Sequence, residues 1–146
     1  MSIETRLAEL GITLPDAPAP AANYVPFVIS GNLLFVSGQI STRKGRLGDD
    51  LAVEAGAEAA RTCGLALLAQ ARAALGSLDR VKRVVKLGGF VNSTPEFTDQ
   101  PEVVNGCSNL MVEVFGDRGR HARAAVSAPA LPRGVAVEVE AIFEIE

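Results

Sequence analysis

Apolar and acidic side chains alternate near the end of the chain, over residues 135–146. The apolar positions are Val135, Val137, Val139, Ala141, Phe143 and Ile145, and the positions between them include Glu138, Glu140 and Glu144. A period of two residues is typical of a strand with one buried face. The pattern therefore predicts a strand over 135–145 whose glutamates share its second face.

Apolar residues spaced by threes and fours predict two helices. The first begins at Asp49 or Asp50 as its cap and ends at Gly76, and small residues at 57, 60 and 64 would let it lie close against a sheet. The second begins near Pro101, with Asp99 as its cap, and ends at Gly116. Cys107 lies on the apolar stripe of this second helix, so we expect it to be buried.

Four further segments read as strands: 25–30, 33–40, 84–91 and 123–128. Segments 25–30 and 33–40 are joined by a tight turn at Gly31-Asn32. Leu33-Leu34-Phe35-Val36 is apolar at every position, so both faces of that strand must be covered. The order is β-β-α-β-α-β-β, which predicts an α+β fold with two helices packed on one face of a sheet.

A short helix and a linker are predicted before the first strand. Residues 2–10 predict a short helix ending at Gly11, and the proline-rich segment 14–20 predicts an extended linker. We interpret residues 1–146 as one domain, with residues 1–22 as an N-terminal extension. The chain has no secretory signal pattern and no apolar run of membrane-spanning length, so a cytoplasmic protein without membrane contact is expected.

Composition narrows the chemistry. The formal net charge is −3 and there is no block of Lys or Arg, which argues against nucleic acid as a partner. His121 is the one histidine, and Cys63 and Cys107 are the two cysteines. Zinc and iron sites built on several imidazoles or thiolates are therefore excluded. Both cysteines are interpreted as small buried residues.

The last two predicted strands could form a hairpin around Leu131-Pro132-Arg133-Gly134. Ser127 would then face Glu138, Ala125 would face Glu140, and Arg123 would share their side of the sheet, unless a bulge at Gly134 shifted the register. Two interpretations remain open. Arg123 and the glutamates form a salt bridge, or an arginine that binds a carboxylate lies beside an acid that positions water.

Four arginines between residues 118 and 133 also allow two interpretations. Arg118, Arg120, Arg123 and Arg133 could together bind an anion, or they could neutralise the nearby glutamates. His121 follows a charged loop, and we expect it to be an exposed polar residue rather than a catalyst.

Several fragments occur in an order and at distances that resemble one known family. They are Asn23-Tyr24-Val25, Ser37-Gly38-Gln39-Ile40, Val104-Asn105, Ala122-Arg123-x-x-Val126 and Leu131-Pro132-x-x-Val135-x-Val137-Glu138-Val139-Glu140-Ala141-Ile142. The ordered set resembles the RidA/YjgF family of enamine/imine deaminases, also described as "endoribonuclease L-PSP". The longer N-terminus and the segment before His121 resemble a divergent subgroup of that family.

The resemblance implies a chorismate-mutase-like fold, a mixed sheet and a homotrimer with clefts between subunits. It also implies hydrolysis of 2-aminoacrylate-type enamines and imines to a 2-keto acid and ammonia, without metal or cofactor. By position, Arg123 matches an arginine that binds the substrate carboxylate, and Glu138 matches an acid that holds or activates water. The matched substrate-binding positions are Tyr24, Ser37, Gly38, Asn105 and Ala125.

Two other functions stay open at this stage. The same cleft could bind small carboxylates or metabolites without turnover. An endoribonuclease is less attractive, because acid–base cleavage of RNA usually recruits paired His or Lys side chains, and this chain has one histidine.

Overall fold

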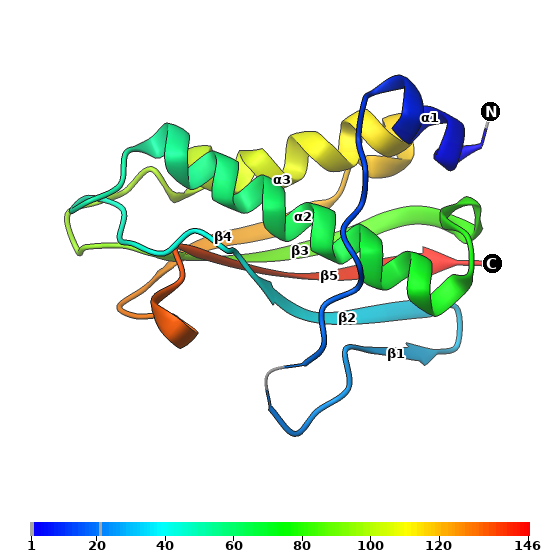
Figure 1. Cartoon of the computed structure of the whole chain (residues 1–146), viewed down its shortest axis with the longest axis horizontal. Helices are drawn as coiled ribbons and strands as arrows, with labels where there is room; N and C mark the ends of the chain where they lie inside the picture. The colour runs from blue at the N-terminus through cyan, green and yellow to red at the C-terminus, as the bar shows by residue number, and fades with distance from the viewer. Residues whose placement is uncertain (1, 21) are drawn as a thin grey trace.

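A computed structural model describes residues 2–20 and 22–146 of the chain, so Met1 and Ala21 of the predicted extension lie outside the described residues (Figure 1). Five strands form one sheet in the order β1-β2-β5-β3-β4. Their bounds are β1 Phe27–Ser30, β2 Leu33–Ile40, β3 Val81–Asn92, β4 Ala122–Ala128 and β5 Val137–Ile145. The pair β3–β4 is parallel and the other neighbours are antiparallel.

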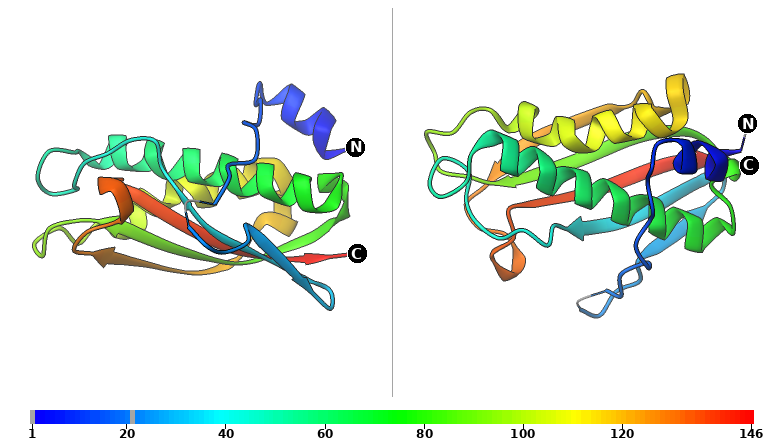
Figure 2. Two further views of the ribbon diagram at one scale, coloured as in Figure 1. Left: turned by 60° about the horizontal axis from the view of Figure 1, so that its bottom comes forward. Right: turned by 45° about the horizontal axis from the view of Figure 1, so that its top comes forward.

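Two long helices, α2 (Val53–Leu75) and α3 (Gln100–Phe115), lie side by side on one face of this sheet (Figures 1 and 2). A short helix, α1 (Ile3–Glu9), precedes them, and three 3-10 turns, Leu78–Arg80, Gly116–Gly119 and Pro132–Gly134, complete the fold. The predicted α+β class, the mixed sheet and the placement of both helices on one face are confirmed. The core lies between these helices and the sheet.

The predicted hairpin between the last two strands is wrong. β5 lies between β2 and β3, where it bonds to a strand on each side, while β4 pairs in parallel with β3 at the edge of the sheet. The alternating apolar side of β5 is buried along its length, which favours a central position. Glu138 therefore lies opposite Ile40 and Phe90 instead of Ser127, and Glu140 lies opposite Gly88 instead of Ala125.

Small residues on α2 allow close packing against α3, instead of against the sheet as predicted. A side chain at Gly106 of α3 would collide with the backbone of Ala57, and one at Gly64 would press on Leu110 and Cys107. The small residues at 57 and 64 thus bring α2 close to α3 rather than to the sheet. Gly89 of β3 gives the sheet its close approach, because a Cβ there would meet Val104 of α3.

The helix ends follow the sequence in part. Gly76 closes α2 with a left-handed conformation (φ 79°), as predicted. The predicted caps at Asp49 and Asp50 are wrong, because Ala52 occupies the cap position of α2 and the Asp50 carboxylate accepts a hydrogen bond from the backbone N–H of Arg46. Asp99 does occupy the cap position of α3, although its side chain forms no capping hydrogen bond there.

The face of the sheet away from the helices exposes apolar side chains. Val28 pairs with Phe35 and Val126 pairs with Phe90, so these residues share that face. Val28 is 51% exposed, Phe35 39% and Val126 46%. Within the described residues, no helix has both the length and the apolar character needed to cross a membrane.

The N-terminal segment crosses the molecule before the sheet begins. The N–H of Ile3 donates to the Asp79 carboxylate (2.7 Å), and Ile3 and Leu7 are buried, which anchors α1. From there the chain runs across α2 towards the β1–β2 edge (Figure 1). On this path the carbonyl of Pro18 accepts a hydrogen bond from the Gln70 side chain (2.6 Å). This segment therefore forms part of the surroundings of β2.

Candidate active site

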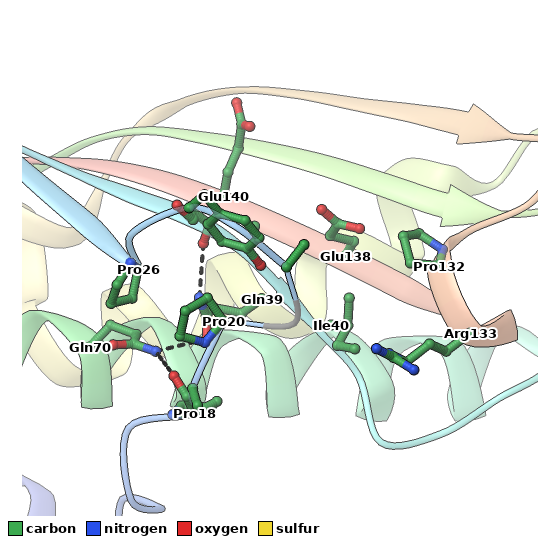
Figure 3. Close-up of a pocket in the computed structure, with 15 residues that line it drawn as sticks. Pro18, Pro20, Pro26, Gln39, Ile40, Gln70, Pro132, Arg133, Glu138 and Glu140 are labelled. Carbon is green, nitrogen blue, oxygen red and sulfur yellow. Dashed lines mark hydrogen bonds between the residues drawn. The ribbon is translucent and has the colours of Figure 1, made fainter.

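A cavity of about 550 Å³ lies where the N-terminal segment passes β2 and β5. Its walls come from the N-terminal segment, β2, β5, one residue of α2 and the turn before β5 (Figure 3). The lining residues are Pro18, Ala19, Pro20, Ala22, Tyr24, Pro26, Ser37, Gly38, Gln39, Ile40, Gln70, Pro132, Arg133, Glu138 and Glu140. Four of the sequence-predicted site residues, Tyr24, Ser37, Gly38 and Glu138, are thus brought together.

A bulge in β2 makes room for Glu138. The pairing of β2 with β5 shifts between Val36 and Gln39, which places Gly38 against the Glu138 side chain. A Cβ at position 38 would collide with the Glu138 carboxylate. The observed position of Glu138 therefore requires a glycine at position 38.

The carboxyl group of Glu138 is in an unfavourable place for negative charge. Partial burial raises its pKa, and the neighbouring Glu140 raises it further. Glu140 itself lies over Gly88 of β3, where a larger residue would meet its side chain. A carboxyl group with a raised pKa exchanges protons closer to neutral pH than an ordinary glutamate, which suits proton transfer to and from water.

Two buried amides form the floor of the cavity on its helix side. Gln70 is 1% exposed and Gln39 is 7% exposed. The Gln70 NH₂ group donates to the Pro18 carbonyl (2.6 Å) and to Oε1 of Gln39 (3.4 Å), and the Gln39 NH₂ group donates to the Ser37 carbonyl (2.9 Å). This chain of hydrogen bonds ties the N-terminal segment to α2 and β2 (Figure 3).

The other predicted site residues lie outside the lining of this cavity. Arg123 is on the edge strand β4, and its guanidinium donates to Oγ of Ser108 (3.0 Å) and to the carbonyl of Pro101 (3.1 Å), both on α3. Its side chain therefore points to the helix side of the sheet. Glu138 points to the opposite face, because it alternates with the buried residues of β5. The prediction that Arg123 shares a face with the glutamates is wrong, because β4 does not pair with β5.

Asn105 and Ala125 belong to the Arg123 region. Asn105 is exposed on α3, on the same helical stripe as Pro101 and Ser108. Ala125 lies two residues after Arg123 on β4 and packs partly against the core. Arg123, Asn105 and Ala125 are thus a second group on the β4 edge, separated from the cavity by β3.

His121 is not the exposed residue that we expected. It is half-buried, its Nε2 is 2.8 Å from Oγ of Ser108, and its Nδ1 is 2.6 Å from the carbonyl of Gly119. Burial lowers the pKa of His121; the hydrogen bond to Gly119 opposes this shift and the nearby charge of Arg123 adds to it. The net shift favours the neutral imidazole.

The four arginines considered together in the sequence do not form one cluster. Arg118 donates to the Val81 carbonyl, Arg120 pairs with Asp117, and Arg133 lines the cavity, while Arg123 contacts α3. The cysteines are buried as predicted. Burial raises the pKa of Cys107 to about 12, which makes its thiol a poor nucleophile.

Sequence reasoning missed several residues of these two regions. In the sequence Gln39 belongs to the fragment Ser37-Gly38-Gln39-Ile40 without a role of its own, and neither Gln70 nor Ser108 belongs to a recognised fragment. Gln70 carried a signal, since it is a lone amide within the apolar run Leu67–Ala71 of a helix. Among the described residues, no three His, Cys, Asp or Glu side chains are grouped so that they could hold a metal ion.

Comparisons with known proteins agree with this architecture. The sequence model of the family described as "YjgF/chorismate_mutase-like, putative endoribonuclease" matches residues 4–144. Protein TCP17 of Trypanosoma cruzi is 53% identical over 98% of this chain and 94% of its own length. The crystal structure of Atu1372 from Agrobacterium tumefaciens, a protein described as having unknown function, is 52% identical, with a TM-score of 0.92 over 99% of this chain and 92% of that one.

A more distant structure contains a small molecule. TdcF of E. coli, crystallised with bound serine, is 25% identical to this chain and has a TM-score of 0.65. The match covers 89% of this chain and 94% of TdcF.

Proposed function

We propose that this chain, which belongs to the YjgF/chorismate-mutase-like family, hydrolyses reactive 2-aminoacrylate-type enamines and imines to 2-keto acids and ammonia. The proposed reaction takes place in clefts between the subunits of a homotrimer. The observation that carries this proposal is Glu138, a carboxyl group with a raised pKa that lines a cavity of about 550 Å³.

The proposed reaction needs few protein groups, because its substrate is already reactive. An enamine such as 2-aminoacrylate takes up a proton at its CH₂ carbon and becomes an imine, whose C=N carbon is electrophilic. Water adds to that carbon, and the resulting carbinolamine loses ammonia and leaves a C=O group. Glu138 holds the water, accepts its proton as the C–O bond forms and returns a proton to the departing amine. Orientation supplies most of the acceleration.

Tyr24, Ser37 and Gly38 shape the wall around this water and substrate. Gly38 leaves space for the Glu138 carboxylate, as the collision of any Cβ there shows. The Ser37 hydroxyl donates to the carbonyl of Val25 (2.8 Å), which holds the segment just before β1 beside the bulge of β2. Tyr24 is 46% exposed and contributes an aromatic wall.

Arg123 binds the substrate carboxylate in this proposal, and it reaches the cavity of a neighbouring subunit. The cavity is on the β2–β5 side of the sheet and Arg123 is on β4 at the opposite edge. Contact between the β4 edge of one subunit and the cavity side of the next would be head-to-tail, and such contacts form a ring when the rotation between subunits closes. A ring of three chains, with Asn105 and Ala125 beside Arg123, would complete three equal sites.

The apolar open face of the sheet supports assembly. Val28, Phe35 and Val126 are partly exposed there, and apolar side chains of this size favour burial against a partner. The doubly apolar run at the start of β2 has the same explanation: helices cover one face and neighbouring subunits cover the other.

The direct test uses 2-aminoacrylate or a 2-imino acid generated in situ, with release of keto acid followed against the uncatalysed rate. The protein accelerates hydrolysis, and Arg123→Ala and Glu138→Gln each lose at least about 100-fold in kcat/KM. Arg120→Ala is the matched control, because this exposed arginine pairs only with Asp117 among the described residues. Absence of acceleration, or full activity in Arg123→Ala, contradicts the proposal.

A carboxylate-binding protein without turnover is the second candidate, and the serine in TdcF favours it. Calorimetry with serine distinguishes the two: saturable binding in a protein that leaves 2-aminoacrylate untouched supports a binder. Endoribonuclease activity, which the family description suggests, requires RNA cleavage that persists after repurification and disappears in Glu138→Gln.

A further inference from the structure

We infer that Ser108 and His121 are positioning residues, which orient the guanidinium of Arg123 through a directed chain of hydrogen bonds. This inference rests on the proposed function, since it concerns how Arg123 is prepared to bind a carboxylate. The chain runs from Arg123 of β4 to Ser108 of α3, then to His121 and the carbonyl of Gly119.

The geometry fixes the direction of every bond in the chain. A backbone carbonyl only accepts hydrogen bonds, so Nδ1 of His121 must carry the hydrogen that points to Gly119 (2.6 Å). In a neutral imidazole Nε2 is then an acceptor, and the Ser108 hydroxyl donates to it (2.8 Å). The lone pairs of Oγ are left for Arg123, whose Nη1 donates to Oγ (3.0 Å).

A second contact fixes the plane of the guanidinium. Nη2 of Arg123 donates to the Pro101 carbonyl (3.1 Å), about two turns from Ser108 on the same stripe of α3. These contacts use two of the five N–H groups of an arginine and leave three for a ligand. A long side chain on an edge strand would otherwise lose much rotamer freedom on binding, so anchoring it beforehand favours affinity.

The charges around His121 preserve this direction near neutral pH. Its side-chain hydrogen bond is with Ser108 of α3, and the charge that acts on its ring is that of Arg123 on β4. On β3, Arg83 donates to the carbonyl of Arg120, next to His121 in sequence. Burial and the positive charge of Arg123 lower the pKa of His121, so the ring does not take the second proton that would reverse its bond to Ser108.

The first test needs no substitution, because the chain has one histidine and its NMR signals need no assignment. We expect the ¹⁵N shifts of the ring at pH 7 to show a neutral imidazole with the hydrogen on Nδ1. A ring with its hydrogen on Nε2, or a cationic ring at pH 7, overturns the inference.

The second test is a double-mutant cycle read by calorimetry, with 2-oxobutanoate as a stable carboxylate of the product class. Ser108→Ala weakens binding about tenfold and His121→Ala about threefold. The double variant binds like Ser108→Ala, because His121 acts through Ser108. His121→Gln, which keeps an acceptor for the hydroxyl, restores most of the affinity.

Ser127→Ala is the control, since Ser127 of β4 is also a serine with a hydrogen-bonded hydroxyl (2.7 Å to Ser93) but forms no hydrogen bond with Arg123. It leaves affinity unchanged. If Arg123→Ala abolishes binding while Ser108→Ala does not weaken it, the positioning role is wrong and the proposed function stands. If Arg123→Ala binds normally, both are wrong. Additive losses in the double variant also overturn the inference.

Discussion

Glu138 in the cavity beside β2 and Arg123 on the β4 edge have opposite surroundings: those of Glu138 destabilise its charge, and those of Arg123 orient its charge. In the cavity, Glu138 lies half-buried next to another glutamate, and its pKa is raised. At the edge, Arg123 is held by a hydroxyl and a backbone carbonyl, with a neutral imidazole behind the hydroxyl.

The difference separates two tasks of the proposed reaction. A group that exchanges protons benefits from an environment that destabilises its charge, whereas a group that binds an anion must keep its charge and its orientation. Because burial and like charge help the first task and harm the second, the two groups benefit from separate surroundings. Assembly can then bring them to one substrate.

Mixing two inactive variants gives the largest expected effect. If the chain forms the proposed homotrimer, Arg123→Ala and Glu138→Gln chains that are unfolded together and refolded form mixed trimers, in which some interfaces pair an intact Arg123 with an intact Glu138. Random mixing should restore about a quarter of the wild-type activity from two inactive parents. Each variant refolded alone is the control. Activity that stays at the level of the parents would place both groups of one site in the same chain.

Gly38→Ala should separate the position of Glu138 from its chemistry. The added methyl collides with the Glu138 carboxylate, so we expect kcat/KM to fall about 100-fold with the fold intact by circular dichroism. Gly88→Ala is the matched control, because its methyl presses on Glu140 instead, and it should cost less than about threefold. Equal losses in the two variants would remove the special role given to Glu138.

Glu140→Gln should change the pH dependence of activity. In the proposed reaction Glu138 acts as an ionised base, so we expect kcat/KM to fall as the pH drops through its raised pKa. The negative charge of Glu140 contributes to that rise, and its removal lowers the pKa of Glu138. The acid limb of the pH profile therefore moves to lower pH, with little change on its plateau. An acid limb that stays in place assigns the titration to another group.

Gln70→Leu should have the smallest effect on activity. It leaves the Pro18 carbonyl without its donor, which should lower the free energy of unfolding by about 1–2 kcal/mol and the Tm by a few degrees. Loosening of the N-terminal wall raises KM about two- to fourfold, with kcat nearly unchanged. Gln100→Leu loses a similar bond, to the Phe97 carbonyl, outside the cavity lining, and should leave KM unchanged.

Local pattern was enough for most of the elements. The spacing of apolar residues predicted α2 and α3, and Gly76 and Gly116 marked their ends. The strand over 33–40 was predicted with its observed bounds. Such features depend on side chains a few residues apart, which the sequence displays directly.

The pairing of strands could not be predicted from local patterns in the same way. β4 and β5 follow one another in the chain with a turn between them, so local reasoning joined them as a hairpin. The structure places β5 between β2 and β3, because its buried face is stabilised best in the middle of the sheet. That one change moved Arg123 away from Glu138 and showed two separate regions.

The sequence by itself determined the types of element, the buried character of Cys63 and Cys107, and the residues that resemble the YjgF family. Only the tertiary structure decided which of those residues meet. Glu138 lies against Gly38 because of a bulge in β2, Gln70 bonds to Pro18 from 52 residues away in the sequence, and Ser108 links His121 to Arg123. Each of these contacts depends on how the sheet and helices pack, and packing is a property of all the segments together.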